Sequence, residues 1–117
     1  MLGKLLKLLG GSGGATYQSI RSGELQEVLK NDKKAQLLDV RAPGEFQSGH
    51  IPKAKNINVM TPNFKSQIQG LDKSKTYYVY CRSGMRSARA CKLMAKEGFE
   101  QVYNLKGGMM AWGGKVV

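Results

Sequence analysis

Residues 81–86 read Cys-Arg-Ser-Gly-Met-Arg and place one thiol beside two guanidinium groups. The preceding run, residues 76–80, is aromatic and β-branched, which is typical of a buried strand. The following run, residues 87–97, is rich in Ala, Leu, Met and Lys and predicts a helix that Gly98 ends. A loop from strand to helix presents backbone N–H groups without helical partners, and the helix dipole adds partial positive charge. The stretch therefore predicts an anion-binding loop with a thiol at its floor.

Cys81 is predicted to be a nucleophile. A free thiol titrates near about 8.5, and a helix N-terminus with nearby arginines lowers this to roughly 3.5–7.5. Arg82 and Arg86 supply the positive charge, and Gly84 can take backbone angles that other residues resist. We therefore expect a thiolate at neutral pH. The alternative is a small buried hydrophobic residue, the usual environment of a lone cysteine.

Composition sets broad limits. The 117 residues are enough for one domain with a core of its own. Nineteen Lys and Arg against eight Asp and Glu give a net charge of +11, but the lysines are scattered and no nucleic-acid motif accompanies them. We interpret them as solvated lysines that attract anions generally, with no specific nucleic acid as partner. Two cysteines and one histidine form neither a disulfide framework nor a zinc site, so no metal or cofactor is expected.

The N-terminal segment differs from the rest of the chain. Residues 1–9 place leucines at helical spacing with two lysines opposite, and residues 10–14 read Gly-Gly-Ser-Gly-Gly. We expect an amphipathic segment and linker over residues 1–14 and a folded domain over residues 15–117. The segment either touches a membrane surface or a partner, or folds back on the domain. A working thiolate suits a reducing compartment such as the cytoplasm, while peripheral membrane contact and export remain open.

The remaining elements alternate between strand and helix. Strands are predicted over residues 17–20, 35–40, 54–59, 76–80 and 101–105. Helices are predicted over residues 23–30, with Ser22 as N-cap, and around Phe64, Ile68 and Leu71, with a long turn over residues 41–52. The pattern predicts an α/β fold: about five parallel strands with helices on both faces. Ligands of such sheets bind beyond the carboxyl ends of the strands, which is where Cys81 lies.

Three blocks of the sequence stand out, in this order: Leu38-Asp39-Val40-Arg41 with Glu45, Phe46, Gly49-His50-Ile51-Pro52, Ala54 and Asn56-Ile57; residues 79–87 around Cys81; and Val102-Tyr103-Asn104-Leu105 with Gly107-Gly108 and Trp112. Together they resemble the single-domain members of the rhodanese family, and the resemblance spans roughly residues 17–112. Lys53 stands where the family more often has glycine.

The resemblance implies a rhodanese-like fold and a ping-pong sulfurtransferase. The Cys81 thiolate would attack the outer sulfur of thiosulfate, sulfite would leave, and the resulting persulfide would pass its sulfur to cyanide or a thiol. Arg82 and Arg86 would bind the anionic substrate. The loop amides would cradle the sulfur, and they belong to Arg82, Ser83, Gly84, Met85 and Arg86.

Other matched residues are expected to support the loop. Asp39 either holds the loop by hydrogen bonds or caps a turn. Arg41 and Glu45 are expected to pair and fix the turn that follows. His50, the only histidine, is expected to have a structural role, since a preformed thiolate needs no base. Cys91 is expected in the core.

Other functions share parts of this pattern. Cysteine phosphatases of related fold place one residue more between Cys and Arg, whereas four residues intervene here, and this loop holds no carboxylate as general acid. A non-catalytic rhodanese-like binding module would have no use for a reactive thiol. A third alternative keeps the persulfide but relays its sulfur to an acceptor protein or toward tRNA thiolation.

Overall fold

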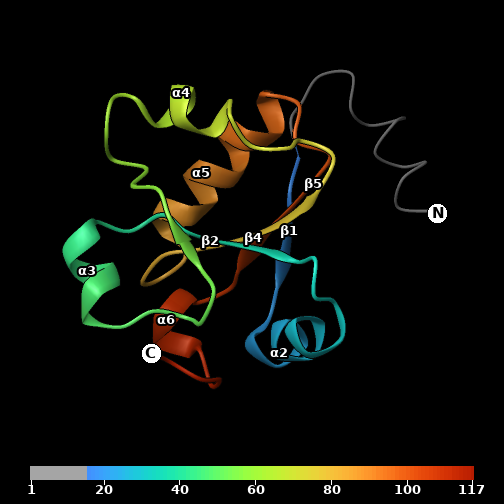
Figure 1. Ribbon diagram of the computed structural model, residues 1–117, viewed down its shortest axis with the longest axis vertical. Coiled ribbons are helices and arrows are strands. Elements are labelled where there is room, and N and C mark those ends of the chain that lie inside the picture. The colour runs from blue at the N-terminus through green and yellow to red at the C-terminus, as the bar shows by residue number, and fades with distance from the viewer. Residues whose placement is uncertain (1–15) are drawn as a thin grey trace.

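Five parallel strands form one sheet in the computed structural model, which describes residues 16–117. In chain order they are β1 (Gln18–Ile20), β2 (Gln36–Asp39), β3 (Lys55–Asn56), β4 (Thr76–Tyr80) and β5 (Gln101–Leu105). Their order in the sheet is β1-β5-β4-β2-β3, with β4 at the centre (Figure 1). The predicted parallel sheet is confirmed, and the residue after its central strand is Cys81.

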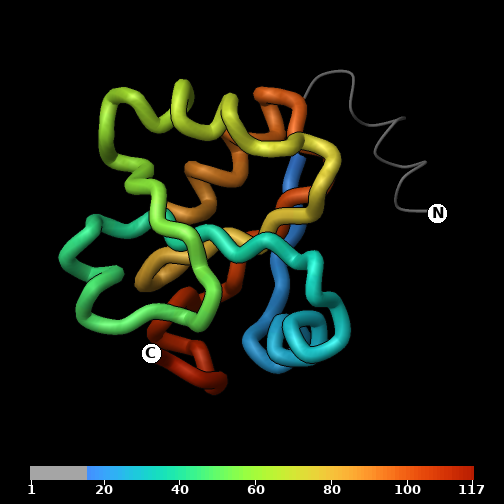
Figure 2. The backbone as a smooth tube through the Cα atoms, in the orientation of Figure 1, coloured from blue at the N-terminus to red at the C-terminus, as the bar shows by residue number. Residues whose placement is uncertain are grey.

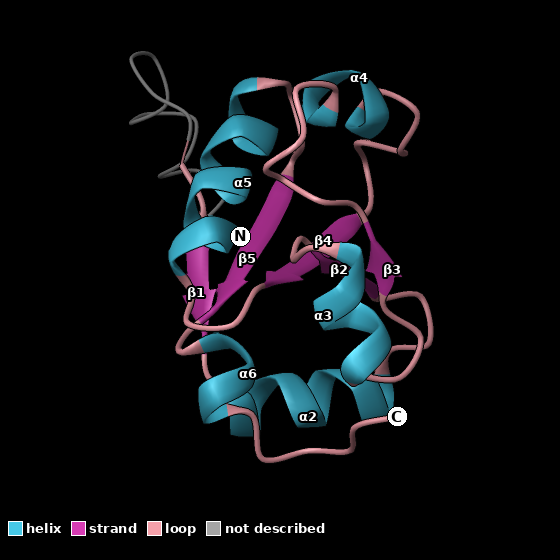
Figure 3. Ribbon diagram, turned by 90° about the vertical axis from the view of Figure 1, so that its left-hand side faces the viewer, coloured by secondary structure: helices cyan, strands magenta, loops and turns pink. Residues whose placement is uncertain are grey.

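Helices cover both faces of the sheet, as predicted (Figures 1 and 3). On one face lie α4 (Phe64–Ile68) and α5 (Met85–Lys96); on the other lie α2 (Ser22–Asn31) and α6 (Gly108–Ala111). A further helix, α3 (Pro43–Ser48), follows β2.

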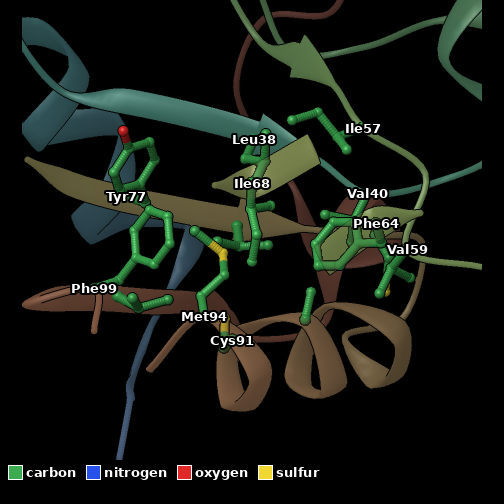
Figure 4. Close-up of a cluster of buried hydrophobic side chains, with 14 residues drawn as sticks. Leu38, Val40, Ile57, Val59, Phe64, Ile68, Tyr77, Cys91, Met94 and Phe99 are labelled. Carbon is green, nitrogen blue, oxygen red and sulfur yellow. The ribbon is translucent and has the colours of Figure 1, made fainter. Parts of the chain in front are cut away.

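Each face has its own hydrophobic core. Figure 4 shows the larger one, in which Cys91 and Met94 of α5 point toward the sheet and Phe64 and Ile68 come from α4. The second core lies on the other face of the sheet and includes Leu25 of α2. Met109 of α6 and Trp112, the residue after α6, pack against this core. The expected core position of Cys91 is confirmed, since its side chain is fully buried. The two cores fix the central strand and the helix that follows it.

The helix α3 occupies part of the predicted long turn. Pro43 stands at its first position, where the missing N–H costs no hydrogen bond. The carboxylate of Glu45 accepts a hydrogen bond from the N–H of Ala42 at 3.2 Å, which caps the helix start. Six residues give too short a periodic pattern to distinguish this helix from a turn.

Some predicted boundaries also change. The helix α2 is capped by Arg21 rather than Ser22, because the Arg21 N–H donates to Glu24 while the Ser22 hydroxyl accepts from Gly113 and Gln26. The strand predicted over residues 54–59 shortens to β3. The amides of residues 57 and 59 nevertheless donate hydrogen bonds to the carbonyls of Asp39 and Val40, at the end of β2. Lys53 has φ +71°, a left-handed conformation that favours glycine.

The expectations for residues 1–14 lie outside the described residues. Between residues 16 and 117 no helix has the length and apolar character needed to cross a membrane.

Candidate active site

Hydrogen-bond donors of Gly84 and Ser87 surround the sulfur of Cys81. The Gly84 N–H lies 3.1 Å from Sγ, the Ser87 N–H 3.3 Å and the Ser87 hydroxyl oxygen 3.4 Å. Ser87 belongs to the first turn of α5, where backbone N–H groups have no helical acceptor. The chain folds this way because Gly84 takes φ +103°, which turns the backbone from the strand end into the helix.

These donors set the acidity of Cys81. Burial raises the pKa of the thiol, but hydrogen bonds from the Ser87 hydroxyl and from the amides of Ser87, Gly84 and Ser83 outweigh burial and lower the pKa below its ordinary value. The Gly84 and Ser87 amides stabilise the thiolate because each points its own hydrogen at the sulfur, whereas the Ser87 hydroxyl has one hydrogen, which Sγ shares with the nearby side-chain oxygen of Asn104. The predicted contribution of backbone N–H groups at the start of the helix is therefore present, and the hydroxyl of Ser87 adds to it.

The Cys81 side chain is 0% exposed, whereas the sequence predicted a thiol at the floor of an open loop. Arg82 and Ser83, which follow it, are exposed, and Gly84 is half-buried. The thiol is therefore buried although the loop residues next to it are exposed. The helix α5 also begins earlier than predicted, so Met85 and Arg86 are its first residues and not part of the loop.

Asn104 supports the loop from β5, a role that the sequence analysis missed. The Ser87 hydroxyl lies 2.5 Å from Asn104 Oδ1, which shares the single hydroxyl hydrogen with Cys81 Sγ, and Asn104 Nδ2 donates to the Gly84 carbonyl at 3.2 Å. The side chain thus joins the neighbouring strand to both residues that bond the sulfur. A polar residue within the otherwise apolar run Val102–Leu105 was the available signal.

Replacing Ser87 with alanine should raise the Cys81 pKa toward its ordinary value, because the thiolate loses its hydroxyl donor. With the higher pKa, a smaller fraction of Cys81 is thiolate at neutral pH, so alkylation at that pH should be several-fold slower than in the wild type. The pH profile of iodoacetamide alkylation measures this. Ser83→Ala is the matched control, because its backbone donor remains, and its profile should not move. An unshifted midpoint in Ser87→Ala would remove the hydroxyl from the account.

The third sequence block packs against the loop. The N–H groups of Met109 and Met110, in α6, donate to the carbonyls of Cys81 and Arg82 at 2.9 and 3.0 Å. Gly108 has φ +56°, and a Cβ there would clash with the Cys81 carbonyl and lie 2.6 Å from that of Arg82. Only glycine allows this approach, which explains Gly108 as part of the site.

Arg86 pairs with Glu45, so the predicted pairing of Arg41 with Glu45 is wrong. Arg86 Nη1 lies 2.7 Å from Glu45 Oε1, and Nη2 lies 3.0 Å from Oε2. The Arg86 guanidinium lowers the pKa of Glu45 to about 2, and Glu45 in turn raises the pKa of Arg86. The predicted substrate-binding arginine therefore already holds a carboxylate.

Arg41 pairs with Asp39 instead. Arg41 Nη2 lies 2.7 Å from Asp39 Oδ2 and also donates to the Gly49 carbonyl at 2.7 Å. The Asp39 carboxylate also accepts from the Arg41 N–H at 2.9 Å, so it caps the turn after β2 and makes no side-chain bond to the cysteine loop. Of the two predicted roles, capping is the one this carboxylate has.

His50 lies in a structural environment. Its ring stacks on Phe46 at 3.7 Å between centroids, and its Nδ1 bonds the Phe46 carbonyl at 2.8 Å. Its backbone exchanges two hydrogen bonds with Val117, so the C-terminal tail runs beside the turn after α3 (Figure 2). Within residues 16–117, no group of three His, Cys, Asp or Glu side chains is placed to hold a metal ion.

The fold and site together define an α/β protein with a cysteine-centred loop at the end of its central strand. The chain belongs to the rhodanese-like domain family, whose model matches residues 22–115.

Named relatives and a solved structure support this assignment. A putative sulfurtransferase of Bacillus subtilis, YtwF, is 39% identical over 84% of this chain and 92% of its own length. A sulfurtransferase of Allochromatium vinosum is 36% identical over 80% of this chain and 85% of its length. The crystal structure of a rhodanese-like domain protein from Staphylococcus aureus superimposes with a TM-score of 0.75 at 34% identity, covering 84% of this chain and 93% of that one.

Proposed function

We propose that the protein is a sulfurtransferase that carries a sulfane sulfur as a persulfide on Cys81. The thiolate attacks the outer sulfur of a donor, such as thiosulfate or a persulfide, and the donor's inner group leaves with the electron pair. A thiophilic acceptor, cyanide or a thiol, then attacks the outer sulfur of the persulfide. Its S–S bond breaks, and the Cys81 thiolate returns.

The hydrogen bonds to Sγ from Gly84 and Ser87 carry this proposal. They stabilise negative charge on sulfur, both on the attacking thiolate and when the thiolate is released again. A purely structural core cysteine has no need of such donors. Cys91 is an internal comparison: burial and the nearby Cys81 raise the pKa of its thiol.

Access to the sulfur requires a local movement of the chain. The Cys81 side chain is fully buried, so residues around it have to shift before a donor sulfur can reach Sγ. Arg82 then lies beside the incoming anion, because it directly follows the nucleophile in an exposed position.

Transfer of sulfur to cyanide tests the function directly. With thiosulfate or an organic persulfide as donor, the protein should form thiocyanate catalytically, while p-nitrophenyl phosphate should remain unhydrolysed. The phosphatase alternative has no supporting observation at this site, because the carboxylate that faces Arg86 has a pKa of about 2 and is a poor proton donor at neutral pH. Phosphate release without thiocyanate would contradict the proposal.

A second candidate passes the same persulfide to an acceptor protein. Two methionines beside the loop, Met85 and Met110, are 80% and 71% exposed, and exposed methionines suit adaptable protein contacts. A putative sulfur carrier protein of Bacillus subtilis, YrkF, is 31% identical over 77% of this chain, which spans 48% of its length. Transfer of labelled sulfur to a thiol-bearing protein faster than to a free thiol would favour this role.

A further inference from the structure

The Arg86 guanidinium has both terminal nitrogens engaged by a single carboxylate. Nη1 and Nη2 lie 2.7 and 3.0 Å from the two oxygens of Glu45, the two-pronged geometry in which guanidinium–carboxylate pairs are strongest. Both side chains are about one-third exposed, so the pair lies at the surface beside the loop. An incoming anion therefore has to compete with Glu45 for this arginine.

The structure holds Glu45 in place independently of Arg86. Glu45 lies in the first turn of α3, and its Oε1 also accepts the N–H of Ala42 at 3.2 Å. Arg41, the neighbouring cation, is already paired with Asp39. Along the described chain, Arg82 is the loop guanidinium with no carboxylate partner.

The net charge of the site then decides which sulfur donors it favours. Arg82 and Arg86 contribute two positive charges and Glu45 removes one, while the attacking Cys81 thiolate adds a negative charge. Thiosulfate brings two negative charges toward that thiolate. An organic persulfide that reacts as R–S–SH brings no charge on its two reacting sulfur atoms, and an uncharged carbon-bearing side can lie against the exposed Met85.

Building on the proposed sulfur transfer, we propose that Glu45 determines donor specificity: by holding Arg86 in an ion pair, it makes the site favour organic persulfides over dianionic thiosulfate. In the favoured reaction the Cys81 thiolate attacks R–S–SH, giving Cys81–S–SH and R–S⁻. The S–S bond of the donor breaks, its electron pair leaves with R–S⁻, and the proton stays on the transferred sulfur. Thiosulfate gives Cys81–S–S⁻ and sulfite, so three negative charges gather in the site.

Glu45→Gln tests the inference because it removes the charge and keeps a side-chain oxygen for the Ala42 N–H. Releasing Arg86 should raise kcat/KM for thiosulfate about tenfold, while the value for the persulfide of 2-mercaptoethanol, whose carbon-bearing side is uncharged, should change by less than about twofold. Glu97→Gln is the matched control, since it also removes one negative charge, but at the far end of α5, where Glu97 pairs with Lys65. This control should leave unchanged the donor ratio, which is kcat/KM for thiosulfate divided by kcat/KM for the persulfide.

The double variant Glu45→Gln/Arg86→Ala shows whether the gain acts through Arg86. Arg86→Ala alone should weaken thiosulfate use below wild type, because it leaves the Glu45 carboxylate unpaired beside the donor. In the double variant the tenfold gain should disappear. Glu45→Ala is a second route to the same result if the glutamine variant loses cooperative melting.

Sulfite binding, measured by calorimetry, gives a readout without turnover. Sulfite is the leaving group of the thiosulfate reaction, and it should bind more tightly to Glu45→Gln than to the wild type. An unchanged donor ratio together with unchanged sulfite affinity would overturn the role of Glu45 while leaving sulfur transfer intact. A wild type that draws sulfur from neither donor would instead refute the proposed function, and the specificity assignment with it.

Discussion

Replacing Cys81 with serine should lower sulfur transfer from any donor to cyanide by at least about 10³-fold, because the nucleophile that carries the sulfur is lost. Serine keeps a small polar side chain in the same buried place, where the Gly84 and Ser87 donors can bond its oxygen. The fold should therefore survive. Initial rates of thiocyanate formation measure the loss.

Cys91→Ser is the matched control for this result. Cys91 is the other buried cysteine of the chain, in the same hydrophobic core, and makes none of the hydrogen bonds that surround Cys81. Its replacement should leave turnover per folded molecule within about twofold of wild type, although stability falls because a polar group enters the core. Sulfur transfer retained by Cys81→Ser would place the chemistry elsewhere.

Asp39→Ala should have the largest effect on stability. Asp39 is fully buried and Arg41 is nearly so, and they are joined by hydrogen bonds of 2.7 to 3.1 Å. Removing one member of a buried pair leaves an uncompensated charge, which costs about 3–5 kcal/mol. Urea denaturation should show a lower midpoint with an unchanged slope.

An exposed ion pair gives the comparison. Glu27 lies 3.7 Å from Lys30 on the surface of α2, and Glu27→Ala should change the free energy of unfolding by less than about 1 kcal/mol. Equal losses in Asp39→Ala and Glu27→Ala would show that the buried pair does not hold the turn after β2.

The succession of strands and helices along the chain and the position of Cys81 could be predicted because they depend on local patterns, whereas the order of the strands within the sheet was not predicted. The apolar runs of β2 and β4 and the turn residues between elements are contiguous in sequence, and alternation of strand and helix constrains the topology. Both β4 and β5 have the predicted bounds. The position of Cys81 at the carboxyl end of β4 could be predicted from the order of strand, loop and helix alone.

The contacts around the cysteine could not be predicted, because they join residues far apart in the chain. Glu45 meets Arg86 across 41 positions, whereas sequence proximity suggested Arg41 as its partner. Asn104 meets Ser87 through the pairing of β4 with β5. The burial of Cys81 likewise depends on how the chain packs around it, and charge patterns alone do not show that.

Intact-mass spectrometry after exposure to a sulfur donor tests the central claim most directly. Brief treatment with thiosulfate or glutathione persulfide should add the mass of one sulfur atom to the protein, cyanide should remove it, and peptide mapping should place it on Cys81. The same treatment should leave Cys81→Ser unmodified. An unchanged mass with both donors, or an added sulfur that maps to Cys91, would contradict the account.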